Sequence, residues 1–262
     1  MIKAMNTAAT GMVSQQTNID NIANNLANVN TTAFKKSRIE FQDILYQNFR
    51  RAGTPSAIGA TIPVNLDVGY GSRAVATTRE FTAGSISITN NATDMAISGN
   101  GFFQVQMPDG TTAYTRDGSF KLSADGQLVT ADGFRLQPEI TIPEDATDLA
   151  IGIDGNISVM VVGSEAPQQV GQVELAKFIN PAGLSAVGHN LFVESAASGA
   201  PTTSTPGSDG LGTLDQGYLE TSNVSVVDEM VNMIMAQRAY EINSKVIQTS
   251  DDMTQVVNSL KR

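Results

Sequence analysis

The chain has 262 residues, 41% of them apolar, so it is long enough for one large domain or two ordinary ones with a sizeable core. Its formal net charge of −10 argues against nucleic acid or an anionic membrane surface as a partner, because both attract concentrated Lys and Arg. There is no cysteine, which excludes disulfides, thiolate metal sites and cysteine nucleophiles.

The first zone, residues 1–46, is predicted to be helical, because it contains a single glycine and no proline. It has no continuous apolar core and no small-residue cleavage site, so it is not a usual secretory signal peptide. No stretch of the chain approaches the roughly 18 apolar residues that a membrane span needs. Apolar residues recur at steps of three, four and seven and form the expected N-terminal assembly seam: Met5, Met12, Ile19, Ile22, Leu26 and Val29.

A row of asparagines runs beside this seam: Asn18, Asn21, Asn24, Asn25 and Asn28. Asparagine is a poor helix former, so something must reward its presence in a helix. Uncharged amides both donate and accept hydrogen bonds, which suits close packing against copies of the same chain, whereas capping or plain solvation is the alternative. The low helix propensity predicts that the chain ends are largely unfolded in the free monomer and fold when neighbours arrive.

Residues 47–72 show no sustained period and contain Pro55 and Pro63, so they are predicted to be an extended connector, with a flexible linker as the alternative. Residues 73–223 are predicted to be a central, mostly antiparallel β domain, because short alternating segments are separated by recurring Asp-Gly turns. Phe103, Val105 and Met107 form one such alternation before a turn. The acidic excess of the chain belongs to this central part.

The last zone, residues 224–262, is predicted to be a helix that starts after Ser225. Its expected assembly seam follows the alternating steps of a coiled coil: Met235, Ala239, Ile242, Val246, Met253, Val256 and Leu260. Each helix could lie on its own domain's core, but burying the two rows against each other is the more economical arrangement. The predicted fold is therefore α+β and multi-domain, with 1–46 and 224–262 forming one discontinuous coiled-coil domain.

The sequence offers no site for catalysis. His189 is the single histidine and lies in a predicted turn, so a zinc site is unfavourable. The acidic residues mostly occupy hairpin turns, and the nucleotide, phosphate-loop, hydrolase and metalloprotease motifs are absent. We therefore expect no catalytic residues, no cofactor and no metal, and a protein that is not an enzyme.

Several motifs resemble the bacterial flagellar rod and hook proteins. The first is Ala23-Asn24-Asn25-Leu26-Ala27-Asn28-Val29-Asn30-Thr31 followed by Phe34-Lys35. The second joins Glu229-Met230-Val231-Asn232-Met233-Ile234 to Gln237-Arg238-Ala239-Tyr240-Glu241, and central motifs such as Tyr114-Thr115-Arg116-Asp117-Gly118 match as well. The resemblance covers nearly the whole chain. One departure is Ala33, because the family usually has glycine before the phenylalanine; a positive φ there would cost about 1 kcal/mol.

The resemblance implies a structural, self-assembling subunit, most similar to the distal-rod members, that forms a rigid hollow drive shaft and transmits torque. The implied partners are copies of itself in a helical tube, the proximal rod proteins, the hook protein, the surrounding L and P ring proteins and the flagellar export apparatus. The implied location is the basal body, from periplasm to outer membrane, reached without a cleaved signal peptide. A proximal rod or hook subunit is the nearest alternative, and a secreted coiled-coil adhesin or a cell-wall hydrolase is a more distant one.

Overall fold

The computed structural model describes residues 2–57, 60–161, 163 and 166–260. The chain forms two compact units. The helix–ribbon unit comprises Met1–Ala27, Ser37–Thr78 and Ser225–Arg262, and the β unit comprises Asn28–Lys36 and Arg79–Val224. The chain therefore passes between the units four times, and the short segment Asn28–Lys36 belongs with the strands although it follows a helix in sequence.

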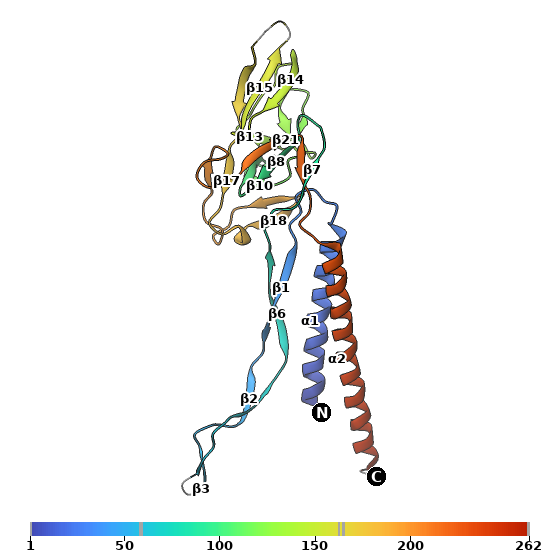
Figure 1. Cartoon of the computed structure of the whole chain (residues 1–262). Coiled ribbons are helices and arrows are strands. Elements are labelled where there is room, and N and C mark those ends of the chain that lie inside the picture. The colour runs from blue at the N-terminus through green and yellow to red at the C-terminus, as the bar shows by residue number, and fades with distance from the viewer. Residues whose placement is uncertain (1, 58–59, 162, 164–165, 261–262) are drawn as a thin grey trace. The chain divides into compact units, whose positions relative to one another are not determined.

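Two long helices confirm the predicted helical ends. Helix α1 is Ile2–Ala27 and helix α2 is Val226–Leu260, and the two pack side by side (Figure 1). Gly11 allows their close approach, because a Cβ at this position would lie 2.9 Å from Asn243 Nδ2. Helix α2 begins as the sequence predicts, since the Asp228 N–H donates to Ser225 Oγ at 3.4 Å. The predicted helical zone extended to residue 46, but helix α1 ends at Ala27.

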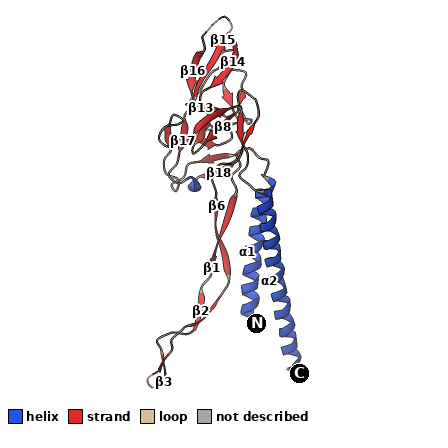
Figure 2. Cartoon of the chain, in the orientation of Figure 1, coloured by secondary structure: helices blue, strands red, loops and turns tan. Residues whose placement is uncertain are grey.

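Residues 37–57 and 60–79 form a two-stranded ribbon (Figure 2). The described residues of the segment 47–72, expected to be an extended connector, form strands β3, β4 and β5 and most of β2 in this ribbon. Strand β1 pairs with β6, β2 pairs antiparallel with β5, and β3 pairs antiparallel with β4. The strands are β1 Ser37–Asp43, β2 Tyr46–Arg50, β3 Pro55–Ala57, β4 Ala60–Thr61, β5 Leu66–Gly69 and β6 Ser72–Arg79.

The β unit confirms the predicted antiparallel β region. Its first strands are β7 Ile86–Ile88, β8 Met95–Ser98, β9 Phe102–Gln106, β10 Thr112–Thr115, β11 Lys121–Leu122, β12 Leu128–Val129, β13 Arg135–Gln137, β14 Ala146–Ile151 and β15 Asn156–Val161. The remaining elements are β16 Gln168–Gln172, β17 Leu175–Lys177, the 3-10 turn Pro181–Gly183, β18 Ser185–Gly188, β19 Leu191–Val193, β20 Thr202–Ser204, β21 Thr213–Gln216 and β22 Tyr218–Glu220.

Strand β9 organises the main sheet, whose order is β11-β12-β13-β9-β10-β19-β18. One edge of β9 pairs with β10, and its other edge is shared by β13 and β17. Phe103 and Val105 point into the core and are fully buried, as their alternation predicts. The ring of Phe103 packs edge-on against Phe120, with centroids 5.2 Å apart. Smaller sheets are β14-β15-β16, β8-β21 and β7-β22.

Candidate assembly surfaces and a buried ion network

The expected C-terminal seam is largely exposed in the single chain. Met235, Ile242 and Leu260 are 63%, 62% and 80% exposed, and Val246, Met253 and Val256 are exposed as well. Only Ala239 in this row is half-buried. The exposure of these apolar side chains shows that the row does not pack against α1 in a single chain.

A different face of α2 packs on α1, and it carries small and polar residues. Glu229, Ala236 and Ser250 are buried and share the heptad spacing of Asn243, which lies against Gly11. The two predicted apolar rows are therefore not buried against each other within one chain, which corrects that expectation. The sequence pattern predicted the apolar stripe of α2 correctly. The contact with α1, however, is made by the small and polar residues, whose heptad spacing is a weaker signal in the sequence than that of apolar residues.

The N-terminal seam is better covered. Ile22 is 4% exposed, and the other residues of the row, Met5, Met12, Ile19, Leu26 and Val29, are half-buried. Val29 lies beyond the end of α1, in the segment that belongs to the β unit.

Two asparagines of the amide row hold the start of the ribbon. Asn25 is 2% exposed; its Nδ2 donates to the Ser37 carbonyl at 2.8 Å, and its Oδ1 accepts from the Ser37 N–H at 3.0 Å. Asn21 Nδ2 donates to the same carbonyl at 2.7 Å, and the Ser37 hydroxyl donates to Asn21 Oδ1. Asn25 Nδ2 also reaches Glu229 Oε2 of helix α2 at 3.4 Å. These amides therefore compensate for their low helix propensity by satisfying partly buried backbone groups of Ser37.

The other asparagines of the row behave differently. Asn28 Oδ1 accepts a hydrogen bond from Thr31 Oγ1 at 3.1 Å, beyond the helix end. Asn18 is half-buried and Asn24 is on the exposed side of α1. Only Asn21 and Asn25 of this row therefore have the ribbon contacts described above.

Further polar contacts join the N-terminal half of α1 to the ribbon. Ser14 Oγ donates to the Ser72 carbonyl at 3.3 Å, and the Lys3 ammonium donates to Gln47 Oε1. Gly71 has φ +114°, and a Cβ there would lie 2.0 Å from Thr10 Oγ1, so only glycine fits. Lys3, Thr10 and Ser14, together with Asn21 and Asn25, form a polar stripe along α1 that contacts the ribbon.

A buried ion network lies in the β unit and includes two residues of the family motifs. The Glu220 carboxylate accepts hydrogen bonds from Lys35 Nζ at 2.6 Å and from Arg116 Nε at 2.8 Å. The side chains of Lys35 and Glu220 are 0% and 1% exposed. Arg116 also donates to the carbonyls of Gly99 and Gly101, at 2.9 and 3.0 Å. All three charges are thus hydrogen-bonded, as buried charges must be.

The network shifts the pKa values of two of its members. Burial raises the pKa of Glu220, but Arg116 and Lys35 outweigh it and hold the pKa of the carboxyl below its usual value. Burial lowers the pKa of the Lys35 ammonium, and the bond to Glu220 opposes this shift. The ion pair between Glu220 and Arg116 was not predicted from the sequence. Arg116 stands in a family motif, but the partner lies 104 residues away in sequence.

The other motif residues lie on different surfaces. Phe34 is half-buried in the β unit, whereas Gln237, Arg238 and Tyr240 are exposed on α2. Arg238 forms an exposed ion pair with Glu241, with Nη1 and Oε2 3.0 Å apart. Arg238 and Tyr240 line a surface hollow of about 560 Å³ on α2, with Glu241, Ile242, Ser244, Lys245 and Gln248.

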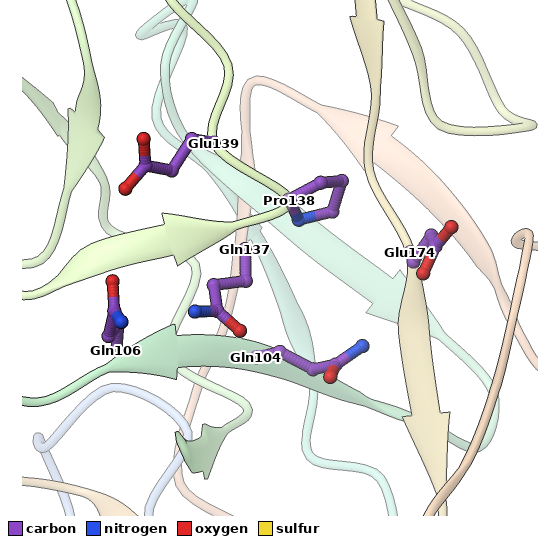
Figure 3. Close-up of a pocket in the computed structure, with 6 residues that line it drawn as sticks. All are labelled: Gln104, Gln106, Gln137, Pro138, Glu139 and Glu174. Atoms are coloured by element: carbon purple, nitrogen blue, oxygen red, sulfur yellow. The ribbon is translucent and has the colours of Figure 1, made fainter. Parts of the chain in front are cut away.

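The remaining polar features suggest no chemistry. A hollow of about 390 Å³ lies in the β unit. Figure 3 shows the residues that line it: Gln104, Gln106, Gln137, Pro138, Glu139 and Glu174. Within the described ranges, no three His, Cys, Asp or Glu side chains are grouped as a metal site would need, and no helix there is long and apolar enough to cross a membrane. His189 and Asn190 both have positive φ and form the predicted turn, between β18 and β19.

Comparison with known proteins places the chain in a family. Its residues 5–35 match the family described as flagella basal body rod protein, 96–159 match the flagellar hook protein FlgE/F/G D1 domain, and 215–260 match the flagellar basal body rod FlgEFG protein C-terminal family. These three matches fall on α1 with its following segment, on the strands from β8 to β15, and on β22 with α2.

Full-length relatives agree with these matches. The chain is 53% identical to the flagellar basal-body rod protein FlgG of Borreliella burgdorferi, over all of both chains. It is 52% identical to the FlgG of Buchnera aphidicola over 99% of this chain and 100% of that one. It is 41% identical to the FlgG of Bacillus subtilis over the full length of both. The chain belongs to the flagellar basal-body rod protein family, and it is a structural subunit of the flagellar rod.

Proposed function

We propose that the protein assembles with copies of itself into the distal part of the rod, as a stiff hollow tube that transmits torque from motor to hook. The observation that carries this proposal is the apolar row of α2, which stays exposed along the helix in the single chain. A soluble protein rarely leaves such a continuous apolar stripe without a partner surface. In the tube, α1 and α2 would form an inner coiled-coil layer, and the seams and the amide row would contact neighbouring subunits.

The size of this row favours several neighbours over one. Full burial of a Leu, Ile or Met side chain contributes about 1.5–3 kcal/mol, and the row is partly covered already, so burying it yields on the order of 10 kcal/mol. Association costs an estimated 4–15 kcal/mol in lost freedom of motion. A single pairwise contact is therefore marginal, and a lattice in which each subunit has several neighbours is the arrangement that favours assembly.

The ribbon supports the distal-rod assignment. A lone two-stranded ribbon is marginal in water, yet this one exposes Leu45, Phe49 and Val64, which are 81%, 56% and 70% exposed. We infer that these side chains are covered by neighbouring subunits, so that the ribbon works as the connector that stiffens the tube.

The proposed partners and location follow the same reasoning. The proximal rod proteins, the hook protein and the L and P ring proteins would adjoin the tube at its ends and around it, in the basal body from periplasm to outer membrane. The flagellar export apparatus would deliver the subunit. The β unit would form the outer layer, and its excess of carboxylates would face these surroundings.

Point variants of the apolar row test the proposal. Ile242→Ser should raise the critical concentration for polymer formation roughly 10-fold or more, because a buried isoleucine contributes about 1.5–3 kcal/mol. The matched control is Ile153→Ser, since Ile153 is 69% exposed in the β unit and outside the row. Sedimentation of both variants measures the effect, and equal critical concentrations for the two would refute a role for the row.

Removing the outer ribbon tests the distal assignment. A chain that lacks residues 47–72 keeps β1 and nearly all of β6, so it should still polymerise. The polymer should bend more than the wild-type tube, because the stiffening connector is gone. Electron micrographs give the curvature, and unchanged straight tubes would assign the chain to another part of the axial structure.

A further inference from the structure

Three segments of the β unit are joined into one cluster, which we call the clasp: residues 33–36, 80–84 and 220–223. The Ala33 N–H donates to the Glu220 carbonyl at 2.8 Å, and the Glu80 N–H donates to the Lys36 carbonyl at 3.0 Å. The Asn223 N–H donates to the Phe34 carbonyl at 3.3 Å. The backbone of residues 33–36 is thus held on both sides by segments that lie far away in sequence.

The centre of the clasp is the Glu220 carboxylate. Its Oε1 accepts from Lys35 Nζ at 2.6 Å and from the Gly84 N–H at 2.7 Å, while Lys35 Nζ donates to the Thr82 carbonyl at 2.7 Å. One lysine and one carboxylate therefore connect all three segments inside the protein.

Asn223 closes the clasp at its other end. Its Oδ1 accepts from the Lys36 N–H at 2.7 Å, and its Nδ2 donates to the Glu80 carbonyl at 2.8 Å. Lys36 and Glu80 add an ion pair of 3.2 Å at the rim. A single amide side chain again joins the same three segments.

The position of the clasp in the chain gives it a further consequence. Residues 33–36 follow the end of α1 closely, and residues 220–223 come just before α2 begins. We propose that the clasp is a positioning device, which ties the chain behind α1 to the chain in front of α2 and so brings the two terminal helices together for pairing. This role concerns folding within one subunit and does not depend on the proposed function.

The buried charges make the device specific. A buried ion pair adds little stability over apolar packing, but an unpaired buried charge is strongly unfavourable. If Lys35 were displaced from the clasp, it would lose both its carboxylate and the Thr82 carbonyl. The network therefore disfavours displacement of this side chain and holds residues 33–36 against the other two segments of the β unit.

Chain statistics give the size of the effect. With the clasp closed, Asn25 and Glu229 are linked to it by roughly 17 residues in all; without it the link runs through the paired strands β1 and β6 and has roughly 27 residues outside that pairing. Loop-closure probability falls as about the 3/2 power of length, so opening the clasp should lower the effective concentration of one helix for the other about twofold.

An engineered cysteine pair measures this concentration directly, because the chain has no cysteine of its own. Asn25→Cys and Glu229→Cys replace two side chains that touch at 3.4 Å. The equilibrium constant of their disulfide against glutathione, in the dilute monomer, reports the effective concentration. Into this background we would introduce Asn223→Ala or Lys35→Met, with Lys121→Met as the matched control on the exposed strand β11.

The expected result is a constant about twofold lower in the clasp variants and no change in the control. Hydrogen exchange shows which variants open the clasp: the Ala33 and Lys36 amides should lose protection while those of β9 and β10 keep theirs. An unchanged constant in such a variant overturns the proposal. If neither Asn223→Ala nor Lys35→Met opens the clasp without unfolding the β unit, the cluster is ordinary core packing, and the proposal fails as well.

Discussion

Glu220 is the residue whose ionisation should control how the β unit responds to acid. Its pKa is held down in the folded state by Arg116 and Lys35, although burial alone would raise it. A carboxyl with a depressed folded pKa contributes stability above its unfolded pKa of about 4.3 and loses it as the pH falls through the folded value. The β unit should therefore weaken below about pH 4.

Glu220→Gln tests this dependence. At pH 6 the variant should unfold with about 3–5 kcal/mol less free energy than the wild type, because Lys35 and Arg116 keep buried charges without a counter-ion. The difference should shrink as the pH falls below 4. Urea titrations of the β unit between pH 3 and 6 provide the measurement, and a difference that stays constant over this range would contradict the account.

Ala33 occupies the position where related sequences were expected to have glycine, and its φ of +55° shows the positive value considered from the sequence. Left-handed geometry costs alanine about 1–2 kcal/mol, but its buried methyl group returns about 0.8 kcal/mol. Ala33→Gly should therefore change the free energy of unfolding by about 1 kcal/mol at most. Ala33→Val should lower it by roughly 2 kcal/mol or more, because a branched side chain is poorly tolerated at positive φ. Equal effects in urea unfolding would be inconsistent with this strain.

At the scale of elements, the terminal helices should be only marginally stable in the free monomer. The amides of α1 lower its helix propensity, and the apolar row of α2 has no partner in a single chain. Amide hydrogen exchange should therefore be fast over residues 5–29 in dilute monomer and slow in the polymer. Strong protection of these residues in the monomer would disprove this expectation.

The fit of the ribbon on α1 depends on Gly71. Gly71→Ala adds a Cβ at 2.0 Å from Thr10 Oγ1 and at positive φ, so we expect a cost of about 1–3 kcal/mol and a critical concentration for assembly raised roughly 5- to 150-fold. Gly53→Ala is the control, because Gly53 also has positive φ but has no atom within 4 Å of the added Cβ. Similar critical concentrations for both variants would show that the contact with Thr10 is unimportant.

The same elements show what a single sequence can and cannot predict. The helices were predictable because a heptad repeats many times within one segment, and β9 because Phe103 and Val105 alternate before a turn. The ribbon pairing was missed because residues 47–72 lack a period of two. The Lys35–Glu220 bond could not be predicted, since its partners are 185 residues apart and nothing in the local pattern connects them.

At the scale of the whole molecule, the charge and the apolar surface belong to different units. The β unit contains 7 Lys and Arg against 17 Asp and Glu, whereas the helix–ribbon unit has 9 of each and therefore no net charge. A unit with no net charge and with exposed apolar side chains can be brought close to its copies, and a strongly acidic unit resists such contact. This division favours a polymer with the helices inside and the β units outside.

Electron microscopy of the purified, concentrated protein tests this central claim most directly. The account predicts straight hollow tubes for the wild type and none at the same concentration for a chain in which Ile242 and Met253 are both changed to serine. Tubes formed equally well by that variant, or a wild-type protein that stays monomeric at every concentration reached, would contradict the account.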